Sequence, residues 1–213
     1  MSSSNKHGIP NNSETSVSLD VSKCVEELCR ADKSAIDLFE ESLRSLVLMA
    51  AKAKEDRHQI RLLVLGLVSL TENYFRHILS DILSVCPISQ GYCSGLEIKY
   101  SSASYFSRSM IAQSLTDGSV FSGSKNIIDE TKKLTGVDVN CSGSVKAALS
   151  EFHKVCVLRH ATVHSYGYLG GKNVYDLGLG SRRNLVVALT WEAFQEICDV
   201  CQNLVRAYNL FLW

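Results

Sequence analysis

The sequence predicts an all-α fold, and three observations support this class. Apolar residues recur every three or four positions in several long stretches, which is the helical period. Only 2 of the 213 residues are proline, so few positions interrupt a helix. Hydrophobic residues make up 46% of the chain and charged residues 21%, which suits a globular domain with a sizeable core. We therefore expect one helical domain.

The domain is expected to span residues 18–213, after a disordered tail at residues 1–17. The tail is rich in serine and asparagine and nearly lacks large apolar side chains, so burial cannot offset the entropy lost on ordering. The first helical pattern runs from Val21 to about Lys54, as one helix or as two with a break near residues 31–34.

The second helical pattern, Arg57 to Val85, is the most apolar stretch of the chain, and Pro87 marks its end. Serine and glycine then become frequent between residues 91 and 143, which predicts an insertion with weaker packing. Two shorter helices are expected inside it, at about Ser102 to Leu115 and Ser124 to Leu134.

A third long helix should begin at a cap formed by Ser142 or Ser144 and end at a run of glycines. These glycines are Gly167, Gly170 and Gly171. The following segment, residues 173–189, holds several turn formers and is a candidate for a short hairpin. Thr190 then caps a last helix, Trp191 to about Phe211.

Charge and hydropathy limit the function classes. Lysine plus arginine and aspartate plus glutamate both number 22, so any site for a polyanion must be local. The apolar runs fall short of the ~20 residues that span a bilayer, and no signal peptide is evident. We expect a cytoplasmic protein without membrane contact, whose 8 cysteines are reduced.

Two charged residues stand where apolar residues belong. Arg159 shares a helical row with Val145 and Phe152, and a buried guanidinium needs a carboxylate, carbonyls or an incoming anion. Glu72 projects from the apolar sector of the second long helix. A Glu72–Arg159 ion pair that directs the arginine is one interpretation, and an edge position for Glu72 is the other.

The histidines near Arg159 allow a metal-site hypothesis, which we rank lower. His153, Cys156, His160 and His164 lie along one helical face, but one helix presents about two adjacent ligands to a single metal. The C-x-x-C pair at residues 198–201 has no second pair at zinc-ribbon spacing and lies on an apolar stripe, so packing explains it better. We expect neither a metal nor a cofactor.

The stretch "RHATVHSY" matches the pattern R-x4-H-x-Y, and here the sequence resembles the HEPN superfamily, all-helical domains of which many are ribonuclease toxins. The resemblance is specific at residues 159–166. It implies a HEPN-like helical bundle and a composite site formed across a homodimer. It also implies catalytic roles for Arg159, His164 and the polar position His160, where the family more often has asparagine or aspartate. In related motifs, a partner nucleotidyltransferase modifies the tyrosine with AMP, which makes Tyr166 a possible modification site.

The residue chemistry agrees with ribonuclease activity. RNA cleaves itself when a 2′-hydroxyl attacks the adjacent phosphate, if one group moves protons and another stabilises the charge that develops. His164 can do the first and Arg159 the second, without a metal. The two are five residues apart, roughly 140° around a straight helix, so convergence requires unwinding near His164 or a second subunit.

The leading hypothesis is a metal-independent endoribonuclease that acts as a toxin or anti-phage defence effector, partnered by an antitoxin or regulatory protein encoded nearby. The alternative is a non-catalytic HEPN-like module that binds a nucleotide, RNA or protein, and a metal-dependent hydrolase ranks third. Basic clusters are candidate phosphate contacts or solvated surface. They comprise Lys52, Lys54, Arg57 and Arg61, and the pair Arg182 and Arg183.

Overall fold

The computed structural model describes residues 19–25, 33–97 and 110–212, and every regular element within these ranges is a helix. The all-α prediction is therefore confirmed. The chain divides into two units, Met1–Asp32 and Lys33–Trp213. The first contains the described 3-10 helix η1 (Val21–Cys24), and the predicted tail, residues 1–17, lies outside the described residues.

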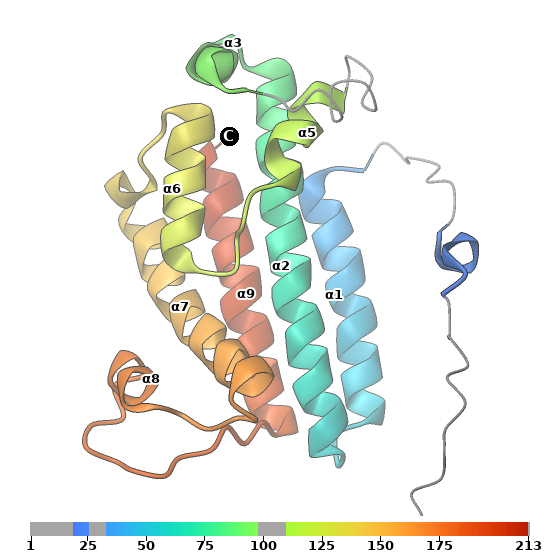
Figure 1. Cartoon of the computed structure of the whole chain (residues 1–213), viewed down its shortest axis with the longest axis vertical. Coiled ribbons are helices and arrows are strands. Elements are labelled where there is room, and N and C mark those ends of the chain that lie inside the picture. The colour runs from blue at the N-terminus through green and yellow to red at the C-terminus, as the bar shows by residue number, and fades with distance from the viewer. Residues whose placement is uncertain (1–18, 26–32, 98–109, 213) are drawn as a thin grey trace, which may run out of the picture. The chain divides into compact units, whose positions relative to one another are not determined.

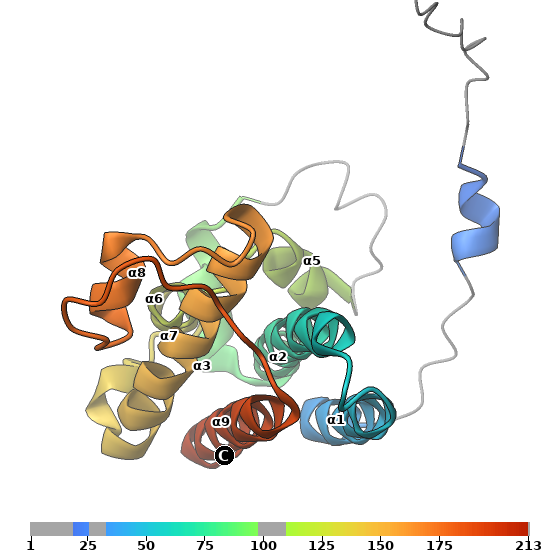
Figure 2. The ribbon, with the colours of Figure 1, turned by 90° about the horizontal axis from the view of Figure 1, so that it is seen from below.

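Long helices form the framework of the second unit. They are α1 (Ala35–Lys52), α2 (Arg57–Val85), α7 (Gly143–His164) and α9 (Trp191–Leu212). Helix α2 contacts each of the other three. Figures 1 and 2 show α2 and α9 between α1 and α7. Within the described ranges, every helix is too short or too polar to serve as a bilayer-spanning segment.

The long helices begin at side-chain caps. The Ser142 hydroxyl accepts the Val145 N–H and the Thr190 hydroxyl accepts the Ala193 N–H, which confirms the two predicted caps. The Ser34 hydroxyl, for which no cap was predicted, accepts the Asp37 N–H. Helix α2 has the predicted bounds, and Pro87 opens the next helix because proline fits a first helical position.

Shorter helices cover one side of this framework. They are α3 (Pro87–Tyr92), η2 (Cys93–Gly95), α5 (Ile111–Asp117), α6 (Ser124–Thr135) and η4 (Val139–Cys141). The prediction of weak packing is wrong for α6, because Ile127 and Leu134 are fully buried and α6 contacts α2, α3 and α7. Most of the other predicted helix, at residues 102–109, lies outside the described residues.

The hairpin expected at residues 173–189 does not form. Helix α8 (Gly171–Asp176) occupies its start, and a loop follows with left-handed glycines at Gly178 and Gly180. The described pairing of this region is a single antiparallel bridge between Tyr168 and Val186. The apolar residues after the loop therefore pair with the exit of α7 instead of with each other.

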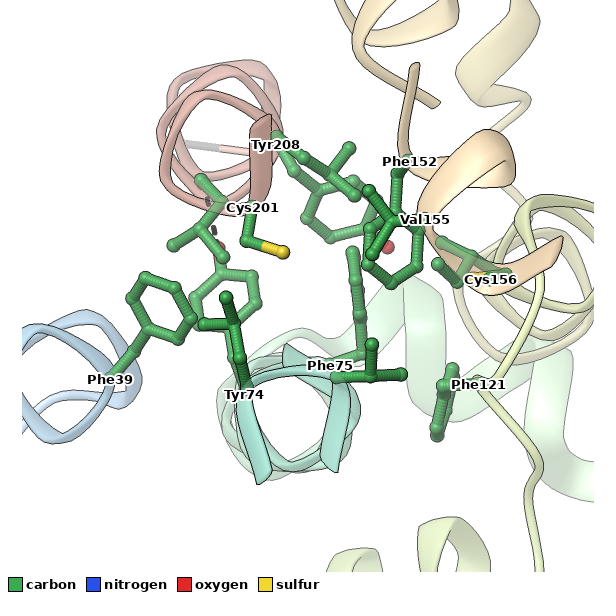
Figure 3. Close-up of a cluster of buried hydrophobic side chains, with 14 of the residues drawn as sticks. Phe39, Tyr74, Phe75, Phe121, Phe152, Val155, Cys156, Cys201 and Tyr208 are labelled. Atoms are coloured by element: carbon green, nitrogen blue, oxygen red, sulfur yellow. Dashed lines mark hydrogen bonds between the residues drawn. The ribbon is translucent and has the colours of Figure 1, made fainter. Parts of the chain in front are cut away.

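An aromatic cluster joins the helices in the core (Figure 3). The Phe75 ring meets the Tyr208 ring edge to face at 4.8 Å between centroids, and Tyr74 packs against Phe39 in the same way at 6.0 Å. The Tyr74 hydroxyl donates to the Val205 carbonyl at 3.3 Å, so this buried polar group is satisfied.

The cysteines in this core are packing residues. Cys156, Cys198 and Cys201 are buried, and burial raises the pKa of each thiol to about 12. Their thiols therefore stay protonated at neutral pH. The packing interpretation of the C-x-x-C pair is confirmed by this burial.

We expect Gly136→Ala to lower the melting temperature. Gly136 ends α6 with φ +74°, which costs a non-glycine residue about 1–2 kcal/mol, and an added Cβ would meet the Tyr92 ring. A loss of this size shifts melting by roughly 2–8 °C in a domain of this length. Gly118→Ala is the matched control, because Gly118 has φ −82° and open space around it. Equal melting of the two variants would contradict this account.

Candidate functional site

The motif residues gather at the C-terminal end of α7. The helix is regular through His164, and Ser165 caps it by donating its N–H to the Ala161 carbonyl at 3.0 Å. The Gly167 N–H donates to the same carbonyl at 2.8 Å, with Gly167 at φ +89°. Gly167 therefore ends the helix as predicted, whereas Gly170 and Gly171 start α8.

The two motif histidines lie side by side. His160 and His164 are one turn apart, and their ring centroids are 4.6 Å apart with an interplanar angle of 44°. Both side chains are exposed to solvent. Because an imidazole can act as a general base or a general acid, this pair can both accept and donate a proton at one place.

Arg159 lies on another side of the helix and is half-buried. Since α7 does not unwind before His164, the two side chains diverge by roughly 140° around the axis. The sequence allowed two ways to bring Arg159 and His164 together, which are unwinding of the helix near His164 and a second subunit. The structure shows no unwinding of α7 near His164.

Glu72 lies near Arg159 but does not form the predicted bond with it. Among the described residues, Arg159 forms no ion pair, and Glu72 Oε1 is buried without a hydrogen-bond partner. Burial raises the pKa of the Glu72 carboxyl above its ordinary value of 4.5, and the charges of Arg159 and Arg76 oppose this rise. Glu72 and Arg159 therefore interact through their charges, and the buried Glu72 Oε1 forms no hydrogen bond with the guanidinium.

The histidine and cysteine row does not assemble. His153 Nδ1 lies 3.5 Å from the Ser124 hydroxyl, Cys156 is buried in the core, and His160 and His164 face solvent. No three histidine, cysteine or acidic residues of the described part of the chain come together with the geometry of a metal site.

Tyr166 follows the histidine in an unusual backbone position. Its φ is +51°, a left-handed conformation that a tyrosine seldom adopts, and the residue is 89% exposed. A modifying enzyme could reach this hydroxyl without unfolding the helix.

Arg61 is a neighbour of the motif that the sequence ranked only as one of several surface charges. Its Nη2 lies 3.2 Å from the position that a Cβ on Gly167 would take, so its guanidinium lies against the exit of α7. Arg61 is half-buried, whereas Lys52, Lys54, Arg57, Arg182 and Arg183 are exposed. The sequence places Arg61 in the second turn of a helix but does not show which segments pack against that helix. The contact between Arg61 and Gly167 could therefore not be predicted.

No family model, curated protein or solved structure matches this chain. The likeness to HEPN domains therefore rests on the motif residues and on the helical setting in which they lie.

We expect Glu72→Gln to stabilise the fold at neutral pH. Because the pKa of Glu72 is raised on folding, its contribution to stability is fully present below about 4.5 and is lost as the pH rises through the folded-state pKa. Glutamine stays neutral, so the melting temperature of the variant should exceed that of the wild type increasingly from acid to neutral pH.

Glu151→Gln serves as the control, because Glu151 is exposed and pairs with Lys154 on the surface of α7. If Glu72→Gln instead melts lower than the wild type at neutral pH, the ionised carboxylate supports Arg159 after all.

Proposed function

We propose that the chain is a metal-independent endoribonuclease of the HEPN type, acting as a toxin or anti-phage defence effector. The observation that carries the proposal is the exposed His160–His164 pair on the last turn of α7. This pair supports proton transfer at a single phosphate, and charge stabilisation there requires an Arg159 from a second subunit. A regulatory protein or antitoxin encoded nearby would hold such an activity in check.

The chemistry needs two proton transfers. The RNA 2′-hydroxyl attacks the adjacent phosphorus while one imidazole, of His160 or His164, accepts its proton. The bond to the 5′-oxygen breaks, and this oxygen takes a proton from the other imidazole. The products are a 2′,3′-cyclic phosphate and a 5′-hydroxyl. Arg159 stabilises the charge on the phosphate oxygens with its forked donors.

A homodimer would complete the site. Arg159 and His164 of one chain point in different directions, so a symmetric dimer that joins the ends of two α7 helices would bring Arg159 of each chain to the imidazoles of the other.

One observation favours a second candidate, a non-catalytic module that binds a nucleotide, RNA or protein. Arg159 is half-buried and interacts electrostatically with Glu72, which also suits an arginine that only stabilises the fold. The two candidates differ in whether purified protein cuts RNA.

Cleavage of RNA should persist in EDTA, leave a 2′,3′-cyclic phosphate and be lost in Arg159→Ala and His164→Ala. Loss of proton transfer lowers the rate by about 10²- to 10⁴-fold. Arg159→Lys should retain little activity because lysine lacks the forked donors. Gel analysis of total RNA and of product ends measures this, with His77→Ala, an exposed histidine of α2, as the control. Cutting that survives both alanine substitutions would exclude the proposed site.

Mixing subunits tests the composite site. Arg159→Ala and His164→Ala proteins are inactive alone, but a mixed dimer holds one intact site, so random mixing should restore about a quarter of wild-type activity. Activity is measured after co-expression of two differently tagged chains and purification of the mixture. A monomer with full activity, or a mixture that remains inactive, would contradict the dimeric arrangement.

A further inference from the structure

Arg61 stands directly beside the end of the motif helix. It lies in the second turn of α2, and its Nη2 is 3.2 Å from where a Cβ of Gly167 would be. Because the Gly167 N–H is bonded to the Ala161 carbonyl, Gly167 is held against the last turn of α7. That turn carries His160 and His164, so a second helix brings a cation to the same end of the bundle.

Within the described part of the chain, the guanidinium of Arg61 has no acceptor. The half-buried Arg76, by contrast, donates to the Ser119 carbonyl at 3.1 Å, and the exposed Arg206 pairs with Glu40 at 3.2 Å. No described ion pair or hydrogen bond engages Arg61. A half-buried guanidinium has lost part of its hydration, and its five donors remain available to an anion.

The acidic residues next to Arg61 in sequence form no ion pair with it. The Asp56 carboxylate accepts the backbone N–H groups of His58 and Gln59 at 2.9 and 3.2 Å, as the cap of α2. Glu55 is exposed, and neither acid forms an ion pair with Arg61. The guanidinium of Arg61 therefore has no ion-pair partner among the described residues, and it lies against Gly167, just after the helix that carries the two imidazoles.

We propose that Arg61 binds a backbone phosphate of the RNA, next to the phosphate that is cleaved. The inference rests on the proposed RNA substrate. Arg61 would fix the strand on the surface formed by the start of α2 and the end of α7, while Arg159 and the two histidines act on the neighbouring phosphate. Its role is sequence-independent, because a phosphate contact positions the strand without reading bases.

Salt dependence of RNA binding tests this role. Binding of a fluorescein-labelled, randomised single-stranded RNA oligonucleotide is followed by anisotropy over a range of salt, in a His164→Ala background that prevents cleavage. Loss of one phosphate contact in Arg61→Gln should reduce the slope of log K against log salt by about 0.7 and weaken binding about tenfold at low salt. Arg61→Lys should keep the slope but lose part of the affinity.

Arg44→Gln is the matched control, because Arg44 is exposed on α1, which α2 and α9 separate from α7 (Figure 2). If Arg61→Gln does not fold, Arg61→Lys decides the question, and wild-type affinity in that variant would overturn the contact.

The outcomes separate this inference from the proposed function. If the wild-type chain cuts RNA and Arg61→Gln behaves like Arg44→Gln, the inference about Arg61 fails and the ribonuclease remains. If the chain binds RNA with an Arg61-dependent slope but does not cut it, the inference holds and the ribonuclease fails. If the chain neither binds nor cuts RNA, both are overturned.

Discussion

Helix α2 is surrounded by α1, α5, α6, α7 and α9, and this burial governs where the second unit can place charge. A helix with neighbours on several sides must be apolar around most of its circumference, because a buried charge without a partner costs several kcal/mol. Polar groups are cheapest at its ends, where Arg57, His58 and Arg61 lie. Glu72 lies in its middle with one buried carboxylate oxygen that has no hydrogen-bond partner, and burial raises the pKa of this carboxyl.

The end of α7 shows how a small backbone feature sets the geometry of a surface. One carbonyl, that of Ala161, accepts the N–H groups of both Ser165 and Gly167, so the chain turns sharply after the last helical turn. The turn leaves His160 and His164 in solvent, sets Tyr166 in a left-handed conformation and brings Gly167 to Arg61. Arg61 and Gly167, which are far apart in sequence, therefore meet just after the helix that carries His160 and His164.

Local features of the fold were predictable from the sequence, whereas contacts between distant segments were not. The bounds of α2 and the Ser142 and Thr190 caps follow from short-range chemistry, which the sequence displays. The hairpin prediction failed because Val186 pairs with Tyr168 across the helix α8 and its loop.

The candidate site likewise combines local features that could be predicted from the sequence with long-range contacts that could not. The one-turn spacing of His160 and His164 already places them together, whereas the helical row of Arg159 predicted a buried guanidinium and the residue is half-buried. A helical wheel shows to which side of a helix a side chain projects, but it does not show which atoms that side chain contacts. It therefore could not show that Glu72 Oε1 has no hydrogen-bond partner. Likewise, nothing near Arg61 in the sequence points to Gly167, because only the packing of α2 against α7 brings them together.

The reactivity of the three buried thiols reports local unfolding of the core. Reagents such as maleimides and disulfides react with thiolates, and with pKa values of about 12 Cys156, Cys198 and Cys201 supply almost none while the core is closed. Their reaction must wait until α7 or α9 separates from the core, so the labelling rate of these cysteines measures local unfolding at the interface that supports the motif helix. Surface thiols such as Cys141 are already accessible and give the reference rate in the same chain.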